Sequence, residues 1–207
     1  MAAARVRSTI EIDARKMSEP RIPTLEPEDW SDEARAALER WMPPMNFHKT
    51  MAHNPRTLRE WIGFGNHILF DNLLPARERE IVILRVAANL DCAYEWGAHR
   101  RYSLELGVLS GVEADRLAFP IRAADWAPRE AALIEAVDDL KTQSAIGERA
   151  WQALVGELGP AGLIDLIYLV GEFSMVAMFM KSFRIALEDG FMPIPRAPGD
   201  EGAGKDG

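Results

Sequence analysis

Apolar residues recur every three or four positions through most of this chain, which is the spacing of an amphipathic α-helix. The pattern predicts helices over about 32–41, 55–70, 75–90, 92–106, 128–141, 146–158 and 160–188, with a short helix after residue 110. No stretch alternates apolar and polar residues as a half-buried strand would, and no Asn-Gly hairpin signal occurs. The sequence therefore predicts an all-α fold.

Capping residues mark several of the predicted helix ends. Asn54 precedes Pro55, which is a cap followed by proline at the first helical position. Ser110 and Glu113 have the spacing of a capping box. Asp91 is predicted to cap the helix that begins at Cys92. These signals agree with the apolar periodicity.

The chain is predicted to form one helical domain with two tails. The first twenty residues mix charged and small residues and read as a loose N-terminal tail. Residues 21–191 contain no internal linker or repeat, so they form one domain. Residues 192–207 are rich in proline and glycine, which predicts a disordered C-terminal tail.

The predicted helix over 160–188 is apolar on nearly every side. A helix of this kind is buried. A 207-residue helical domain offers few places to bury it within one subunit. We therefore expect a subunit interface along this helix, made by side chains that include Phe173, Met178, Phe179 and Phe183.

Composition narrows the choice of compartment and partner. A net charge of −8 without a basic block argues against nucleic acid or an anionic membrane as partner. Cys92 is the only cysteine, which excludes an internal disulfide and fits a reducing compartment. The N-terminus lacks the apolar core of a signal peptide, and no run reaches the ~20 apolar residues of a membrane span. We expect a cytoplasmic protein.

The most informative segment holds a thiol, a carboxylate and an imidazole on one helix face. Cys92, Glu95 and His99 are spaced at i, i+3 and i+7. The first turn of a helix lowers the pKa of a thiol, whereas the nearby Glu95 carboxylate raises it. A lone cysteine is also often a small buried hydrophobe, and a Glu–His pair is often a surface contact. The functional and the structural readings both stay open at this point.

The run from Glu80 to Gly107, ERE…LRVAANLDCAYEWGAHRRYSLELG, resembles the carboxymuconolactone decarboxylase family, which includes the alkylhydroperoxidase D-like proteins. Glu80, Cys92 and His99 match the Glu, first Cys and His of the peroxidase branch, and Glu95 stands in place of its second Cys. The resemblance implies an alkylhydroperoxidase D-like helical bundle that assembles as a homo-oligomer, often a trimer or hexamer. It also implies that Glu80 faces Cys92 and His99 from the neighbouring helix.

Four catalytic candidates follow. Glu80 and His99 are the predicted acid–base pair, and Cys92 and Glu95 support them. Glu95 either orients His99 or is a second acid–base carboxylate. The conflict between Glu95 and a thiolate at Cys92 favours acid–base over thiol redox chemistry.

Four further residues are candidate substrate contacts. Tyr94 and Trp96 either pack in the core or line an apolar pocket. Arg85 lies in an apolar run and needs a carboxylate partner, from the protein or from the substrate. Glu172 is a charge within the apolar helix. No metal is expected, since the remaining histidines, His48, His53 and His67, fit no zinc pattern, and no Gly-rich phosphate motif points to a nucleotide cofactor.

We therefore predict a cofactor-free acid–base enzyme, a decarboxylase, isomerase or related lyase. Its substrate would be a small organic acid, lactone or enolisable carbonyl compound. Two alternatives stay open: a thiol-dependent peroxidase that uses Cys92, and a non-catalytic oligomeric protein that binds a small molecule. A peroxidase would need a resolving thiol from elsewhere, because the chain has one cysteine.

Overall fold

The computed structural model describes residues 19–39, 41 and 43–197, and within these ranges it contains eight α-helices, two short 3-10 helices and no strand. The all-α prediction is confirmed. The elements in chain order are η1 Pro27–Asp29, α2 Asp32–Leu38, α3 Asn46–Met51, α4 Pro55–Phe70, α5 Ala76–Asn89, α6 Ala93–Glu105, α7 Gly111–Arg116, η2 Ala123–Asp125, α8 Pro128–Gln143 and α9 Glu148–Phe183.

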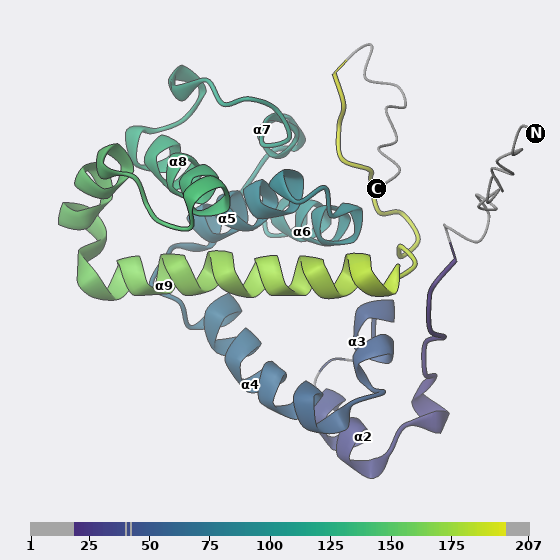
Figure 1. Ribbon diagram of the computed structural model, residues 1–207. Helices are drawn as coiled ribbons and strands as arrows, with labels where there is room; N and C mark the ends of the chain where they lie inside the picture. The colour runs from purple at the N-terminus through teal and green to yellow at the C-terminus, as the bar shows by residue number, and fades with distance from the viewer. Residues whose placement is uncertain (1–18, 40, 42, 198–207) are drawn as a thin grey trace, which may run out of the picture.

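The long helix α9 runs through the middle of the molecule and separates two groups of helices (Figure 1). On one side α5, α6 and α8 pack together, and α5 contacts both of the others as well as α9. On the other side α4 packs against α9 and carries α2 and α3. The space between α4, α6 and α9 is therefore bounded by helices from both halves of the chain.

Helix α5 is the most deeply buried of these elements. Its four consecutive residues Ile81, Val82, Ile83 and Leu84 have no exposed surface, because α6, α8 and α9 surround them. A polar residue next to this run is shielded from bulk water. Glu80, directly before this run, is accordingly fully buried.

Most of the predicted helix ends are confirmed by hydrogen bonds. Asn54 Oδ1 accepts the Thr57 N–H at 3.2 Å, and Ser110 and Glu113 form the predicted reciprocal capping box. Gly107 follows α6 with φ 67°, a conformation that glycine adopts without strain. Residues 46–51 form a helix, α3, that the apolar periodicity did not predict because it spans less than two turns.

The predicted break between the helices over 146–158 and 160–188 is confirmed at Gly159. The element α9 spans Glu148–Phe183 but consists of two helical parts that meet in a kink at Gly159, where φ is 61° and ψ is 179° directly before Pro160. It ends at Arg184, in the left-handed conformation with φ 53°, and not at Glu188. By length and apolar composition α9 could span a membrane, but half of its most apolar window is buried within this fold.

Much of the apolar surface of α9 is buried within its own subunit. Phe173, which was expected at a subunit interface, is 8% exposed and lies in the main core. Met178 is 63% exposed, as the interface prediction requires. The large apolar side chains that α9 leaves exposed in its second half are Ile164, Ile167, Tyr168, Met175 and Met178. A stripe, not the whole helix, is thus free for a partner.

The segment after α9 returns along α6 instead of leaving the domain. Phe191 is buried and packs on Tyr94, with ring centroids 5.3 Å apart. Ile194 packs against a second core cluster, and Arg196 pairs with Asp91 at 3.1 Å. The predicted disordered tail therefore does not begin at 192. The rest of that tail, 198–207, and residues 1–18 of the predicted N-terminal tail lie outside the described residues.

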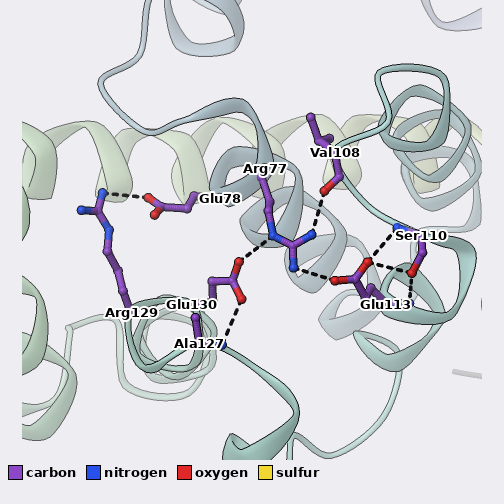
Figure 2. A network of polar contacts seen from close by, with 8 residues as sticks. All are labelled: Arg77, Glu78, Val108, Ser110, Glu113, Ala127, Arg129 and Glu130. Atoms are coloured by element: carbon purple, nitrogen blue, oxygen red, sulfur yellow. Dashed lines mark hydrogen bonds and ion pairs between the residues drawn. The ribbon is translucent and has the colours of Figure 1, made fainter.

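A network of ion pairs ties the start of α5 to α7 and α8 (Figure 2). Arg77 donates to Glu130 at 2.6 Å, to Glu113 at 2.7 Å and to the Val108 carbonyl at 2.8 Å. The Arg77 guanidinium and the Ser110 hydrogen bonds lower the pKa of Glu113 to about 2. This network fixes the end of α5 from which Glu80 is presented.

Candidate functional site

A mostly apolar cavity of about 120 Å³ lies between α3, α4, α6 and α9. Its described lining combines aromatic rings, two histidines, two glutamates and several aliphatic side chains. These residues are Trp41, Met45, Phe47, His48, Trp61, Ile62, Gly65, Asn66, Leu69, Tyr94, Glu95, Ala98, His99, Glu172, Phe173, Val176 and Met180. Three of the predicted site residues on α6 and the one on α9 thus meet a wall made by α3 and α4.

Glu80 and His99 form the hydrogen-bonded pair that the resemblance implies. His99 Nδ1 lies 2.9 Å from Glu80 Oε2, which brings α5 and α6 together. When Glu80 is ionised its carboxylate can only accept, so Nδ1 is then the donor and Nε2 is left as the basic nitrogen of the ring. His99 lines the cavity, and Phe173 packs edge-on against its ring at 4.9 Å between centroids. Glu80 stands behind His99, away from the cavity lining.

Glu95 lies in the cavity wall and is 1% exposed. Among the described residues neither of its carboxyl oxygens has a hydrogen-bond partner. Burial, followed by the negative charge of Glu172, raises the pKa of Glu95 well above its ordinary value. Glu95 therefore holds a proton more strongly than an exposed glutamate does. The expectation that it orients His99 finds no hydrogen bond in its support.

Glu172 reaches the same cavity from α9. Its Oε1 accepts a hydrogen bond from Trp61 Nε1 on α4, and its Oε2 is buried without a partner among the described residues. Burial raises the pKa of Glu172, while the bond from Trp61 acts in the opposite direction. Glu172 also lines a surface groove with Phe64, Tyr168 and Met175. This one side chain lies between the cavity and the exposed stripe of α9.

Cys92 does not line the cavity. It is the N-terminal boundary residue of α6, in place of the predicted cap Asp91, which adopts a left-handed φ of 49°. The thiol is 1% exposed, and its Sγ lies 3.9 Å from Met180 Sδ. Burial, and next the charge of Glu95, raise the pKa of Cys92 to about 12. The expected lowering by the helix terminus is outweighed, so a thiolate is disfavoured.

Two of the predicted substrate contacts lie elsewhere. Arg85 donates to both oxygens of Asp138 at 2.7 Å and to the carbonyls of Leu117 and Phe119, so four of its five N–H donors are engaged by the fold. Trp96 is fully buried in the second core cluster. Both side chains leave α5 and α6 on the side away from the cavity, so neither can contact a ligand there.

Tyr94 lines the cavity as predicted, but its hydroxyl is engaged. The hydroxyl donates to Glu188 Oε1 at 2.6 Å and accepts the Phe47 N–H at 3.2 Å. Burial is the main cause that raises the pKa of Tyr94. Tyr94 therefore joins α3 to the segment after α9 and offers its ring to the cavity.

His48 and the aromatic wall are the site residues that the sequence did not reveal. His48 is buried, and its Nδ1 accepts the Met45 N–H at 3.2 Å. Burial lowers its pKa to about 4, so it is neutral near pH 7. Trp41, Phe47 and Trp61 surround it. The only signal in the sequence is the aromatic-rich stretch around His48, a histidine that fits no zinc pattern.

The cavity thus combines an acid–base pair with two poorly solvated carboxyl groups. In the described ranges no group of three or more His, Cys, Asp and Glu side chains is placed to hold a metal ion. The lining, as far as the structure describes it, contains no lysine or arginine. Such a site can move protons on a small, largely uncharged molecule.

These features define an all-α protein with the alkylhydroperoxidase D-like fold. The chain superposes on an alkylhydroperoxidase AhpD core, described as an uncharacterized peroxidase-related protein from Ralstonia eutropha JMP134, with a TM-score of 0.73 and 21% identity over 83% of this chain and 94% of that one. It is also similar to an uncharacterized peroxidase-related protein from Silicibacter sp. TM1040, with a TM-score of 0.70 and 18% identity over 84% and 97% of the two chains.

Residues 55–139 match the model of the carboxymuconolactone decarboxylase family. The predicted resemblance to this family is confirmed over these residues, and the solved structures share the alkylhydroperoxidase D-like fold. No curated protein sequence matches the chain significantly. The matched region contains α4, α5 and α6, and with them Glu80, Glu95 and His99.

Proposed function

We propose that this protein is a cofactor-independent acid–base enzyme, a lyase or isomerase, that acts on a small enolisable carbonyl compound or lactone. The observation that carries the proposal is the Glu80–His99 pair at the wall of a mostly apolar cavity. His99 would take a proton from the substrate through Nε2, and Glu80 would hold the imidazole in position and stabilise its charged form. Every step needs only side chains of this chain.

The environment favours such chemistry. The apolar lining would displace water from the substrate and strengthen hydrogen bonds to the charge that develops on it. Burial raises the pKa values of Glu95 and Glu172, so both carboxyl groups hold a proton more strongly than exposed glutamates do and are candidate proton donors. An organic acid that must bind as an anion is the least favoured of the three predicted substrate classes, because no cation is found in the described lining.

The thiol peroxidase alternative has less support. A peroxidase needs an accessible thiolate, whereas Cys92 is buried and burial raises its pKa to about 12. The two similar structures that are described as peroxidase-related are only 21% and 18% identical to this chain. Similarity at this level indicates a shared fold but not a shared reaction. A non-catalytic binding protein would use the same cavity, so only turnover distinguishes it.

Proton exchange tests the proposed reaction without knowledge of the physiological substrate. Small ketones and lactones are incubated with the protein in D2O, and loss of the α-proton signal is followed by NMR. We expect exchange that falls 10²–10⁴-fold in His99→Ala. His67→Ala is the matched control, since His67 is exposed on α4 and outside the cavity. Exchange that is unchanged in His99→Ala, or absent from the wild type for the whole panel, would contradict the proposal.

We further propose that the protein is a cytoplasmic homo-oligomer, a trimer or hexamer. The exposed stripe of Ile164, Ile167, Tyr168, Met175 and Met178 on α9 supports an interface there. Phe64 on α4 adjoins the same stripe through its edge contact with Tyr168. Because Glu172 lines both the groove in this surface and the cavity, assembly would also shield the site from water.

A further inference from the structure

The cavity contains one carboxyl group whose chemistry is unused by the hydrogen bonds of the fold. We propose that Glu95 is a protonated hydrogen-bond donor that receives the carbonyl oxygen of an uncharged ligand. The ligand class is then a small ketone, aldehyde or lactone with an apolar body, in preference to a carboxylate or an amine. This inference rests on the site of the proposed function and names the ligand that the site selects.

The position of Glu95 argues for a role toward a ligand. Glutamate three residues after a helix boundary often reaches back to the boundary residue's backbone N–H. Here the Cys92 N–H already donates to the Ala87 carbonyl at 2.9 Å, so this use is absent. Both Glu95 oxygens are instead buried beside the cavity without a partner among the described residues. Leaving such a group without a hydrogen bond costs about 1–3 kcal/mol. A ligand that accepts a hydrogen bond from Glu95 would offset this cost.

The surroundings of Glu95 favour its neutral form. No ion pair or hydrogen bond to the Glu95 carboxyl is found in the described part of the chain, and Glu172 is a second acidic group in the same wall. His48 in the opposite wall is neutral near pH 7 because burial lowers its pKa to about 4. A buried carboxyl group that lacks a positive neighbour keeps its proton, and a kept proton can be donated to a carbonyl oxygen.

The same surroundings disfavour charged ligands. A carboxylate would lie between Glu95 and Glu172 with no lysine or arginine in the described lining to offset its charge. An ammonium group would find aromatic faces, which attract cations, but it would require Glu95 or Glu172 to give up a proton in a desolvated site. An uncharged carbonyl needs neither change.

The dimensions of the cavity limit the ligand to about one ring, whose short substituent would lie at the side where the cavity opens. Its volume is about 120 Å³. An apolar cavity of about 150 Å³ in another protein holds benzene. In the proposed reaction His99 would remove the α-proton, the C–H electron pair would form the enolate, and the carbonyl π electrons would move to oxygen. The Glu95 O–H bond to that oxygen would then strengthen as negative charge develops.

Four ligands of matched shape test the inference through binding alone. Acetophenone carries the carbonyl, and α-methylstyrene replaces its oxygen by CH2. Benzoate and benzylamine carry the negative and the positive charge. Dissociation constants are measured at pH 7 by calorimetry or by quenching of Trp41 and Trp61, which line the cavity. We expect acetophenone to bind at least tenfold more tightly than each of the other three.

Variants then assign the preference to Glu95. In Glu95→Leu the preference for acetophenone over α-methylstyrene should disappear, and in Glu95→Gln, which keeps an N–H donor, part of it should remain. Trp96→Phe, outside the cavity, should leave it unchanged. An infrared band of a protonated carboxyl group should be present at pH 7 in Glu172→Gln and absent from the Glu95→Gln, Glu172→Gln double variant.

Three outcomes would overturn the inference. These are equal binding of acetophenone and α-methylstyrene by the wild type, tightest binding of benzylamine or benzoate, and a preference that survives in Glu95→Leu. The binding test is independent of turnover. Preferred binding of the carbonyl ligand without proton exchange would contradict only the proposed reaction. Proton exchange without preferred binding of the carbonyl ligand would contradict only the proposed role of Glu95.

Discussion

His99 Nδ1 on α6 and Glu80 Oε2 on α5 lie 2.9 Å apart, with Glu80 completely buried behind the imidazole. The other oxygen of Glu80 has no hydrogen-bond partner among the described residues, so His99 is its main polar contact. This arrangement directs one carboxylate to one ring nitrogen. The pair therefore acts as a unit, in which Glu80 determines which nitrogen of His99 is basic.

Replacement of Glu80 should consequently reduce turnover without abolishing ligand binding. We expect Glu80→Gln to lower kcat by about 10–100-fold, which is less than the effect of His99→Ala, because the amide holds the ring but does not stabilise its positive charge. Steady-state kinetics and the dissociation constant of acetophenone measure the two effects. Glu78→Gln is the matched control, since Glu78 pairs with Arg129 away from the cavity. A Glu80→Gln enzyme with wild-type kcat would remove Glu80 from the mechanism.

The thiol of Cys92 should be inert in the folded protein. Its burial and raised pKa predict that iodoacetamide labels it only after unfolding, and that Cys92→Ala keeps most of the proton-exchange activity. The loss of packing against Met180 should lower the free energy of unfolding by about 1 kcal/mol. Mass spectrometry and denaturant titration give these values. Sustained peroxide turnover that is lost in Cys92→Ala would show that Cys92 is a catalytic thiol and would contradict this prediction.

Removal of the Glu95 carboxyl group should stabilise the fold. Glu95→Leu replaces two buried oxygens without partners by an apolar group of similar size, so we expect a gain of about 1–3 kcal/mol in the free energy of unfolding. Because the pKa of Glu95 is raised, its folded form retains a proton that the unfolded form loses above about pH 4.5. The advantage of the variant should grow as the pH rises above that value. Thermal unfolding from pH 4.5 to 8 is the measurement, and a destabilised Glu95→Leu would show that the carboxyl group has a partner.

His48 should make the fold sensitive to acid. The pKa of His48 in the folded protein is about 4, below its ordinary value of 6.5. Between these two pH values, His48 therefore binds a proton in the unfolded chain but not in the folded one. Stability should therefore fall from pH 6.5 to 4 by on the order of 2–3 kcal/mol through this residue. His48→Asn keeps an acceptor for the Met45 N–H and should flatten the profile. The exposed control His67→Asn should leave the slope unchanged, and an equal slope in His48→Asn would contradict the assignment.

The exposed stripe of α9 should carry the subunit contact. Light scattering at micromolar concentration should give a multiple of the 23.1 kDa chain mass, and Met175→Glu with Met178→Glu should reduce it. Trp151→Glu is the control, because Trp151 is similarly apolar and exposed but lies before the kink at Gly159. A soluble wild-type monomer would show that the stripe remains open to water.

The sequence by itself determined the helices and most of their ends. Apolar periodicity and local capping act within a few residues of each other, so Asn54, Ser110 and Gly107 could be read from their neighbours alone. The match of Glu80 and His99 to a known pattern likewise needed only the chain order. The break at Gly159 before Pro160 could also be read from the chain, whereas the end of α9 at Arg184 was missed, because an apolar run does not show where the helix stops.

Only the tertiary structure decided which side of each helix faces the cavity. Cys92, Glu95, Trp96 and His99 lie within eight positions of one another on the chain, yet Glu95 and His99 face the cavity while Cys92 and Trp96 enter separate core clusters. His48 reaches the site through α3, about fifty residues away. Desolvation depends on everything that surrounds a group, so the direction of each pKa shift follows from the packing of α4, α6 and α9 and not from the spacing of residues.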